Sequence, residues 1–143
     1  MNLGNLLFTF GGRINRAKYW LTALIWFAAW AIWGAILFAS DFSLAAIALG
    51  VVVIIASIIS GIAVGIKRLH DREKSGWWLL LFYFAPGILD QIGRQAGDAG
   101  ILFMLASTAI TIWMIVELGC LRGTIGPNRY GPDPLAVTAA QAV

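Results

Sequence analysis

Arginine is the residue type that recurs in the polar parts of this sequence. Six arginines lie in three short motifs, at residues 11–20, 67–78 and 122–134. A guanidinium group donates paired hydrogen bonds to a phosphate or carboxylate, and the glycines of the third motif allow backbone N–H groups to approach an anion. The pattern therefore suggests a site for an anionic lipid headgroup or another small anion. The candidate residues are Arg13, Arg16, Arg68, Arg72, Arg122 and Arg129. The alternative is that these arginines only anchor helices at a membrane surface and pair with acidic residues.

The sequence offers little for catalysis or metal binding. His70 and Asp71 are its one histidine–carboxylate neighbourhood suited to proton transfer. Adjacent residues on a helix do not face one another, so we interpret both as groups that bond the backbone where a helix ends. A single histidine and a single cysteine, Cys120, do not make a usual zinc site. We expect no enzyme activity, no metal and no cofactor.

Glu117 is the one acidic residue inside a full-length apolar segment. An unpaired carboxylate costs roughly 2.5–3.5 kcal/mol near the bilayer centre and less toward the interface. We therefore expect Glu117 to form an ion pair with an arginine from another part of the chain. The candidate partners are Arg13, Arg68 and Arg122. The alternative is a transporter or channel component in which Glu117 lies in a polar path.

The elements that position these residues are apolar and long. Of the 143 residues, 60% are hydrophobic and 12% are charged, against roughly 45–50% and 25% in soluble proteins. This composition argues against a soluble enzyme and indicates that the solvent is a lipid bilayer. Four segments, at residues 19–39, 44–66, 77–92 and 101–121, are predicted to span it. Three of these segments reach about 30 Å as helices, whereas the segment at 77–92 is short and contains Pro86.

These segments predict an all-α fold, an integral membrane four-helix bundle whose third span is broken by Pro86. Residues 1–134 form one membrane domain, and residues 135–143 are expected to be a disordered tail. With four spans, nine of the ten lysines and arginines lie on one side and Arg94 lies on the other. Basic residues mark cytoplasmic loops, so both termini are predicted to be cytoplasmic. The basic residues form separate clusters and not a continuous stripe, which argues against nucleic acid binding.

Small residues recur at intervals of four in the second segment. Ser57, Gly61 and Gly65 would allow another helix to approach closely. That helix is expected to be the first or fourth span of the same chain, or the same face of a second copy. A homo-oligomer and a different membrane-protein partner therefore both remain alternatives.

The three motifs, taken in order, resemble a family of bacterial integral membrane proteins known as domain of unknown function 805. The matching stretches are FGGRINRAKYW at 10–20, KRLHDREKSGWW at 67–78 and GTIGPNRYGPDP at 123–134. Lys67 stands where the family often has arginine. The resemblance implies a small, multi-pass protein of the bacterial inner (plasma) membrane without an established biochemical role. We interpret nine further motif residues as structural, namely His70, Asp71, Gly76, Trp77, Gly126, Asn128, Tyr130, Gly131 and Asp133.

The sequence thus predicts a non-enzymatic membrane protein whose three polar motifs pack together on the cytoplasmic side. Their arginine- and glycine-rich surface is expected to bind a partner, an anionic lipid headgroup or a small anion. The second hypothesis is the transporter or channel component with Glu117 in its path. The third is an intramembrane enzyme that uses His70 and Asp71.

Overall fold

The computed structural model describes residues 2–136, and within them the chain is all helical, with no β-strand. The elements are α1 (Leu3–Phe8), α2 (Arg16–Ala39), α3 (Leu44–Asp71), α4 (Trp78–Gln95), η1 (Gly97–Ala99), α5 (Gly100–Ile115) and the π-helical turn η2 (Val116–Cys120). Residues 134–136 add a helical turn. The rest of the tail that we expected to be disordered, residues 137–143, lies outside the described residues.

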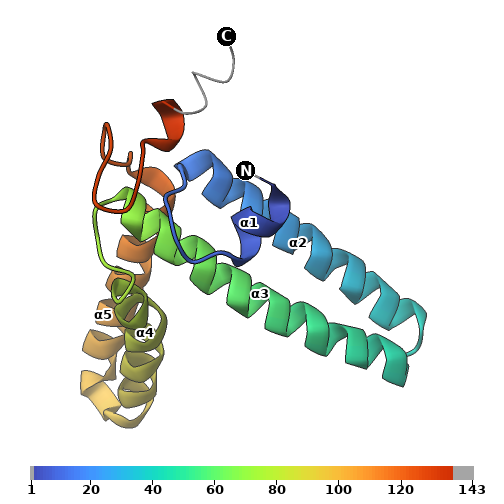
Figure 1. Ribbon diagram of the computed structural model, residues 1–143. Coiled ribbons are helices and arrows are strands. Elements are labelled where there is room, and N and C mark those ends of the chain that lie inside the picture. Colours follow the sequence, from blue (N-terminus) through green and yellow to red (C-terminus); the bar gives the residue numbers. More distant parts are fainter. Residues whose placement is uncertain (1, 137–143) are drawn as a thin grey trace.

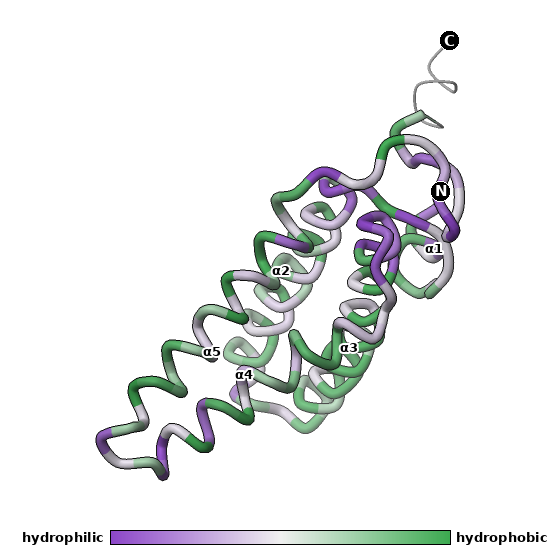
Figure 2. The backbone as a smooth tube through the Cα atoms, turned by 90° about the vertical axis from the view of Figure 1, so that its left-hand side faces the viewer, coloured by the Kyte–Doolittle hydropathy of each residue, from purple (hydrophilic) through white to green (hydrophobic). Residues whose placement is uncertain are grey.

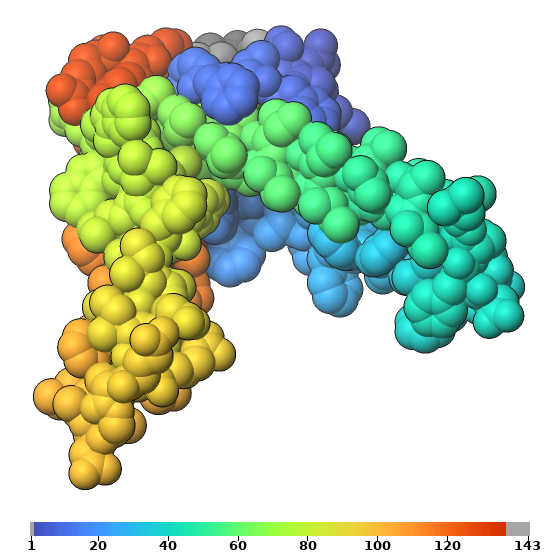
Figure 3. All heavy atoms as spheres, turned by 90° about the horizontal axis from the view of Figure 1, so that it is seen from below, coloured from blue at the N-terminus to red at the C-terminus, as the bar shows by residue number. Residues whose placement is uncertain are grey.

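The long helices form two antiparallel hairpins that meet at one end and diverge toward the other (Figure 1). One hairpin consists of α2 and α3, and the other consists of α4 and α5. Helix α2 lies against η2 rather than against α5, so the hairpins touch only near their shared end. The arrangement therefore differs from the closed four-helix bundle that we expected. Figure 3 shows the open angle between the two arms.

Three helical stretches are long and apolar enough to cross a membrane: Arg16–Ala39, Leu44–Asp71 and Gly97–Cys120. Helix α4 is shorter and carries Asp90 and Arg94 near its end. The prediction that Pro86 breaks this segment is wrong, because Pro86 lies inside a continuous helix of 18 residues. Proline removes one backbone hydrogen bond, and a membrane helix tolerates that loss where neighbouring groups compensate.

Short polar side chains set the starts of the helices. The Asn15 side chain accepts a hydrogen bond from the Lys18 N–H at 3.0 Å and caps α2. Ser43 accepts one from the Ala46 N–H at 3.3 Å and caps α3. Both follow the usual preference for asparagine and serine before a helix. Glu73, with φ of 58°, takes a left-handed conformation just after α3 and turns the chain toward α4.

The first hairpin is held by tryptophans as well as by apolar contact. Trp26 Nε1 donates to Ser60 Oγ at 2.9 Å, and Trp33 Nε1 donates to the Ala46 carbonyl at 2.9 Å. Most of the large apolar side chains on both arms are exposed; Phe27, for example, is 75% exposed. Figure 2 shows hydrophobic arms and hydrophilic residues gathered at the end where the hairpins meet. This is the distribution expected of helices that face lipid.

Candidate functional site

The three polar motifs meet at the shared end of the two hairpins, and we call this region the polar head. It comprises residues 12–20, 67–78 and 117–134. The first comes from the start of α2, the second from the end of α3 and the turn into α4, and the third from η2 and the segment after it.

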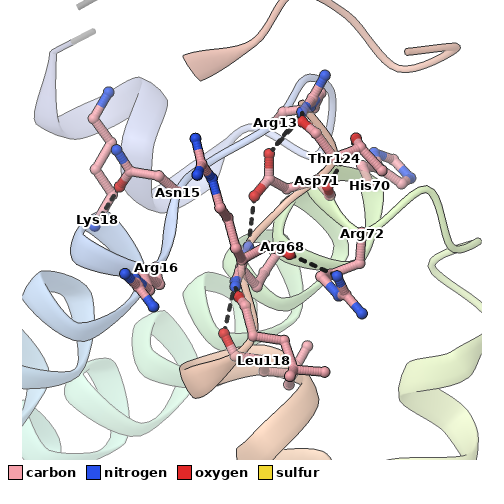
Figure 4. Close-up of polar contacts among 12 residues, drawn as sticks. Arg13, Asn15, Arg16, Lys18, Arg68, His70, Asp71, Arg72, Leu118 and Thr124 are labelled. Atoms are coloured by element: carbon pink, nitrogen blue, oxygen red, sulfur yellow. Dashed lines mark hydrogen bonds and ion pairs between the residues drawn. The ribbon is translucent and has the colours of Figure 1, made fainter. Parts of the chain in front are cut away.

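At the centre of the polar head, the Asp71 carboxylate lies between two arginines (Figure 4). Its Oδ1 accepts from Arg13 Nε at 3.1 Å, and its Oδ2 accepts from Arg68 Nη1 at 2.5 Å. The side chains of Arg13, Arg68 and Asp71 are 1%, 0% and 4% exposed. Since Arg68 and Asp71 both lie on α3, this buried carboxylate joins the first motif to the end of α3.

The remaining donors of these two arginines bind backbone carbonyls of the third motif. Arg13 donates to the carbonyls of Thr124, Gly126 and Gly131 at 2.6, 2.7 and 3.2 Å. A guanidinium has five N–H groups, and with two nitrogens of Arg13 within 3.1 Å of Asp71 its donors are occupied. Arg13 therefore holds the third motif in place.

Arg68 plays the same part at the end of η2. It donates to the carbonyl of Leu118 at 2.7 Å and to that of Leu121. Carbonyls at the end of a helix lack intrahelical donors and carry partial negative charge. Because Arg68 is fully buried and its donors bind these carbonyls and Asp71, its guanidinium is inaccessible to a ligand.

The third motif also packs directly on Asp71. The Asp71 carbonyl accepts from the Thr124 N–H at 2.8 Å. A Cβ atom at Gly123 would overlap the Asp71 carboxylate, which explains the glycine at this position. Asn128 continues the contact, since its Nδ2 donates to the His70 carbonyl and to Thr124 Oγ1, both at 2.9 Å.

The end of the third motif forms a small turn closed by a carboxylate. The backbone groups of Asn128 and Gly131 exchange two hydrogen bonds of 3.0 Å. Gly126 and Gly131 adopt positive φ, 78° and 138°, in this segment. Asp133 accepts from the N–H groups of Leu135 and Gly126 at 2.9 and 3.0 Å, and these bonds lower the pKa of its carboxyl below the ordinary 3.8.

Glu117 lies on η2 and is 4% exposed. Its two carboxylate oxygens pair with Arg72 Nε and Lys74 Nζ, each at 3.0 Å. The Lys74 ammonium also lies 5.4 Å from the ring centroid of Trp78 and 5.8 Å from that of Trp113, at cation–π range. The expected partners of Glu117 were Arg13, Arg68 and Arg122, and that assignment is wrong. The first two are engaged by Asp71 and by backbone carbonyls, and only the backbone carbonyl of Arg122 approaches this group, as an acceptor for Arg72.

His70 and Asp71 do not share a partner. The His70 ring stacks on Tyr130 with centroids 3.8 Å apart, and its Nδ1 lies 3.3 Å from the Gly12 carbonyl. Arg129 covers the other side of this pair, with its Cζ 4.8 Å from the Tyr130 centroid, and its Nη2 donates to the Glu73 carbonyl at 3.0 Å. His70 thus packs the third motif against the end of α3.

The stripe of small residues on α3 faces α4. A Cβ atom at Gly65 would lie 2.9 Å from Leu79, and Tyr83 Oη donates to the Gly61 carbonyl at 3.4 Å. The partner is therefore the third predicted segment, and not the first or fourth span. Gly76 packs on Ile66 where α4 begins, whereas Trp77 is 78% exposed.

Sequence reasoning missed Lys67. Its side chain is 1% exposed, and its Nζ donates to the carbonyls of Asn5 and Leu6 at 2.9 and 2.6 Å, at the end of α1. It also gave no partner for Trp20, whose Nε1 donates to the Gly119 carbonyl at 3.0 Å. The acceptors are backbone carbonyls, which leave no signature in the sequence.

Arg16 and Arg122 are placed differently from the buried arginines. Both are exposed and line a pocket of about 210 Å³ between the start of α2 and the third motif. Arg16 donates one hydrogen bond, to the Cys120 carbonyl at 3.2 Å. The Arg122 guanidinium donates none within residues 2–136. Asp71 and Asp133 also line the pocket. Arg13 and Arg68 pair with Asp71 but do not line the pocket themselves.

Residues 7–132 match the sequence profile of the family described as "Protein of unknown function (DUF805)". The chain is 31% identical over 137 residues to "Uncharacterized protein YiiR" of Escherichia coli K12, a match that covers 93% of this chain and 90% of the relative. It is 34% identical over 125 residues to "Inner membrane protein YhaI" of the same organism, covering 87% and 85%. "Inner membrane protein YhaH" is 36% identical over 73 residues, covering 50% and 40%. No solved structure matches the chain.

Proposed function

This chain belongs to the family described as Protein of unknown function (DUF805), and from that premise we propose that it is a non-enzymatic bacterial inner-membrane protein whose polar head binds an anionic lipid headgroup. Two relatives are named as inner membrane proteins. In this proposal α2, α3, α4 and α5 all cross the membrane, and the polar head lies at its cytoplasmic surface. Helix α4, with 18 residues, reaches roughly 27 Å.

One observation carries the proposed binding site: the arginines of the polar head fall into two groups. Arg13 and Arg68 are buried, and protein acceptors occupy their donors. Arg16 and Arg122 are exposed on either side of the same pocket. Their guanidinium groups keep N–H donors for an oxyanion, which arginine binds bidentately.

The position of the pocket favours a lipid headgroup over a soluble anion. It lies at the end of helices long enough to cross the hydrocarbon core, so its depth corresponds to that of the phosphate groups. Its volume of about 210 Å³ is below the roughly 300–1,000 Å³ of pockets that enclose a whole small ligand. A headgroup whose lipid tails stay in the bilayer suits such a pocket.

The groups that could transfer a proton have structural partners instead, which supports a non-enzymatic role. Asp71 is held by two arginines, and His70 is stacked on Tyr130. Glu117 has both oxygens paired with cations at the polar head. A transporter role for Glu117 lacks a supporting observation of this kind.

Native mass spectrometry of the purified protein with added phosphatidylglycerol or phosphatidylcholine tests this function. We expect preferential retention of phosphatidylglycerol, lost in the double variant Arg16→Gln/Arg122→Gln. The variant Arg94→Gln, which removes an exposed arginine at the opposite end of the molecule, is the matched control and should behave like the wild type. Equal retention of both lipids, or equal loss in the control, would contradict the proposal. Displacement of phosphatidylglycerol by millimolar inorganic phosphate would assign the pocket to a soluble anion.

A further inference from the structure

A second hollow lies between α3 and α4, where the two arms of the molecule meet (Figure 3). Its volume is about 780 Å³, within the roughly 300–1,000 Å³ typical of ligand sites. Apolar side chains of both helices form most of its wall, among them Ile58, Ile62, Leu80 and Phe84. It shares no lining residue with the pocket at Arg16 and Arg122.

Small residues on α3 keep this cleft open. Ser57 and Gly61 belong to its lining, and a Cβ atom at Gly61 would meet nothing closer than Tyr83 Oη at 4.0 Å. Along the stripe at Ser57, Gly61 and Gly65, α4 packs tightly at Gly65, near the polar head, and at Gly61 only the Tyr83 hydroxyl reaches α3. Farther along α3 the stripe leaves space that no side chain of the described residues fills.

The cleft has one polar end and one apolar end. Ser75, His70 and Tyr130 line it where it reaches the polar head. The exposed guanidinium of Arg129 does not line the cleft itself but lies 4.8 Å from the ring centroid of Tyr130, which does. The cleft thus has hydroxyl groups, with a cation beside them, at one end and apolar side chains along the rest. A phospholipid is complementary to this arrangement, because it has an anionic phosphate at one end and apolar chains beyond it.

The apolar end continues along α4. A shallower hollow of about 580 Å³ begins at Tyr83 and Phe84, which line both hollows, and extends to Gln95. The combined track follows one side of the helix, in the direction that lipid chains take when the helix crosses the bilayer. A track of this shape fits an extended chain better than a compact ligand.

We propose that this cleft binds one phospholipid, with an acyl chain between α3 and α4 and its phosphate against Arg129 and Ser75. An apolar cleft that opens sideways at hydrocarbon depth is unfavourable for water. A chain lodged there fills the space between the diverging hairpins and completes their packing. The site depends on the phosphate and the chain, not on net lipid charge. It rests on the function proposed above only in requiring that α4 crosses the membrane.

Photocrosslinking of the full-length protein in phosphatidylcholine vesicles tests this site, with a diazirine on the acyl chain as the probe. We expect crosslinks on the cleft-lining parts of α3 and α4 in excess of those on the lipid-facing surface of α2. Gly61→Leu places a side chain in the cleft and should reduce the excess to the level of α2. Gly34→Leu is the matched control, since nothing lies within 4 Å of a Cβ at that glycine; it should leave the pattern unchanged.

Two further variants guard against misinterpretation. Ser57→Leu fills the same cleft from another turn of α3 and should act as Gly61→Leu does. Arg129→Gln should weaken crosslinking in the cleft while circular dichroism shows an intact fold. Uniform labelling of α2, α3 and α4 in the wild type would overturn the proposal. The proposal would also be overturned if a second copy of this chain occupied the cleft and prevented lipid crosslinking there. The same holds if both cleft-filling variants kept the wild-type crosslinking pattern.

Discussion

Asp71 is a single residue on which three segments of the polar head depend. Its carboxylate accepts from Arg13 and Arg68, and its carbonyl accepts from Thr124. Removing one member of a buried ion pair leaves the other charge uncompensated, at a cost of about 3–5 kcal/mol. We therefore predict that Asp71→Asn lowers the thermal unfolding temperature in detergent far more than Asp98→Asn, which changes an exposed aspartate in the turn between α4 and α5. Equal unfolding temperatures for the two variants would show that the bridge is dispensable.

Glu117 supports a second residue-scale prediction. Because both of its oxygens hold cations of the segment that follows α3, Glu117→Gln should lower thermal stability in detergent. It should create no pH-dependent ion flux in liposomes, since the carboxylate acts as a tie between η2 and residues 72–74. Unchanged stability together with altered proton or cation flux would reverse this assignment.

The sequence predicted that the arginines of the three motifs would come together, but not what they would bind. The distribution of basic residues between the apolar segments predicted that Arg13, Arg68 and Arg122 lie on the same side of the membrane. The partners of Arg13 and Arg68 are chiefly carbonyls of residues 118–131. Every residue carries such a carbonyl, so only the fold reveals which ones are left without helical donors.

At the scale of elements, α2 packs closely on α3 where the ring of Trp33 lies against Gly50. A Cβ atom at Gly50 would lie 2.5 Å from the Trp33 ring, whose Nε1 donates to Ala46. We predict that Gly50→Ala destabilises the hairpin by about 1–3 kcal/mol through overpacking. Gly34→Ala, with open space at its Cβ, should be neutral or stabilising by up to about 1 kcal/mol. Thermal unfolding in one detergent compares the pair, and a loss of equal size in both would contradict the assigned contact.

The stability of the segment 122–134 is expected to depend on pH because of Asp133. Its pKa lies below the ordinary 3.8 because the N–H groups of Leu135 and Gly126 bind the charged form. The stabilisation is therefore present above pH ~4 and is lost as the pH falls through the lowered pKa. Amide hydrogen exchange in this segment should accelerate over that acidic range, after correction for the intrinsic rate. Asp133→Asn should remove the pH dependence, and its persistence in that variant would point to another group.

The lengths of the apolar segments predicted the helices well, and the position of proline predicted a break wrongly. Residues 19–39 and 44–66 lie within α2 and α3, and both helices extend further at the polar head. The extensions contain Arg16, Arg68 and other charged residues, which hydropathy excludes from a span. At Pro86 the helix continues, because proline removes only one backbone hydrogen bond and the helix keeps the others.

For the whole molecule, the proposed four spans make a prediction about sidedness. A reporter active only in the periplasm should be inactive when fused after Val143 and active when inserted in the turn at Asp41. The same reporter should be active in the turn at Asp98 if α4 crosses the membrane. Activity after Val143 would contradict the shared cytoplasmic position of the two termini. An inactive fusion at Asp98, with normal expression, would show that α4 does not span.

The diverging arms were not predictable from the sequence. Four apolar segments of suitable length suggested a closed bundle, since such segments must pack against something. In the structure, the polar head fixes the hairpins to one another at one end, and contacts between them fade along α3 and α4. In a bilayer, lipid supplies the apolar surroundings that a soluble bundle would have to provide from its own side chains, so closure is not required.

The carbonyls that hold Arg13 and Arg68 also bear on how the protein is made. Both arginines are synthesised well before residues 118–131, which supply those acceptors. Until those residues have been synthesised, the two guanidinium groups share Asp71 as a partner but lack these carbonyls. Assembly of this end is a late event in biosynthesis. A nascent chain halted before residue 118 therefore lacks the carbonyls that occupy most of the donors of these two arginines.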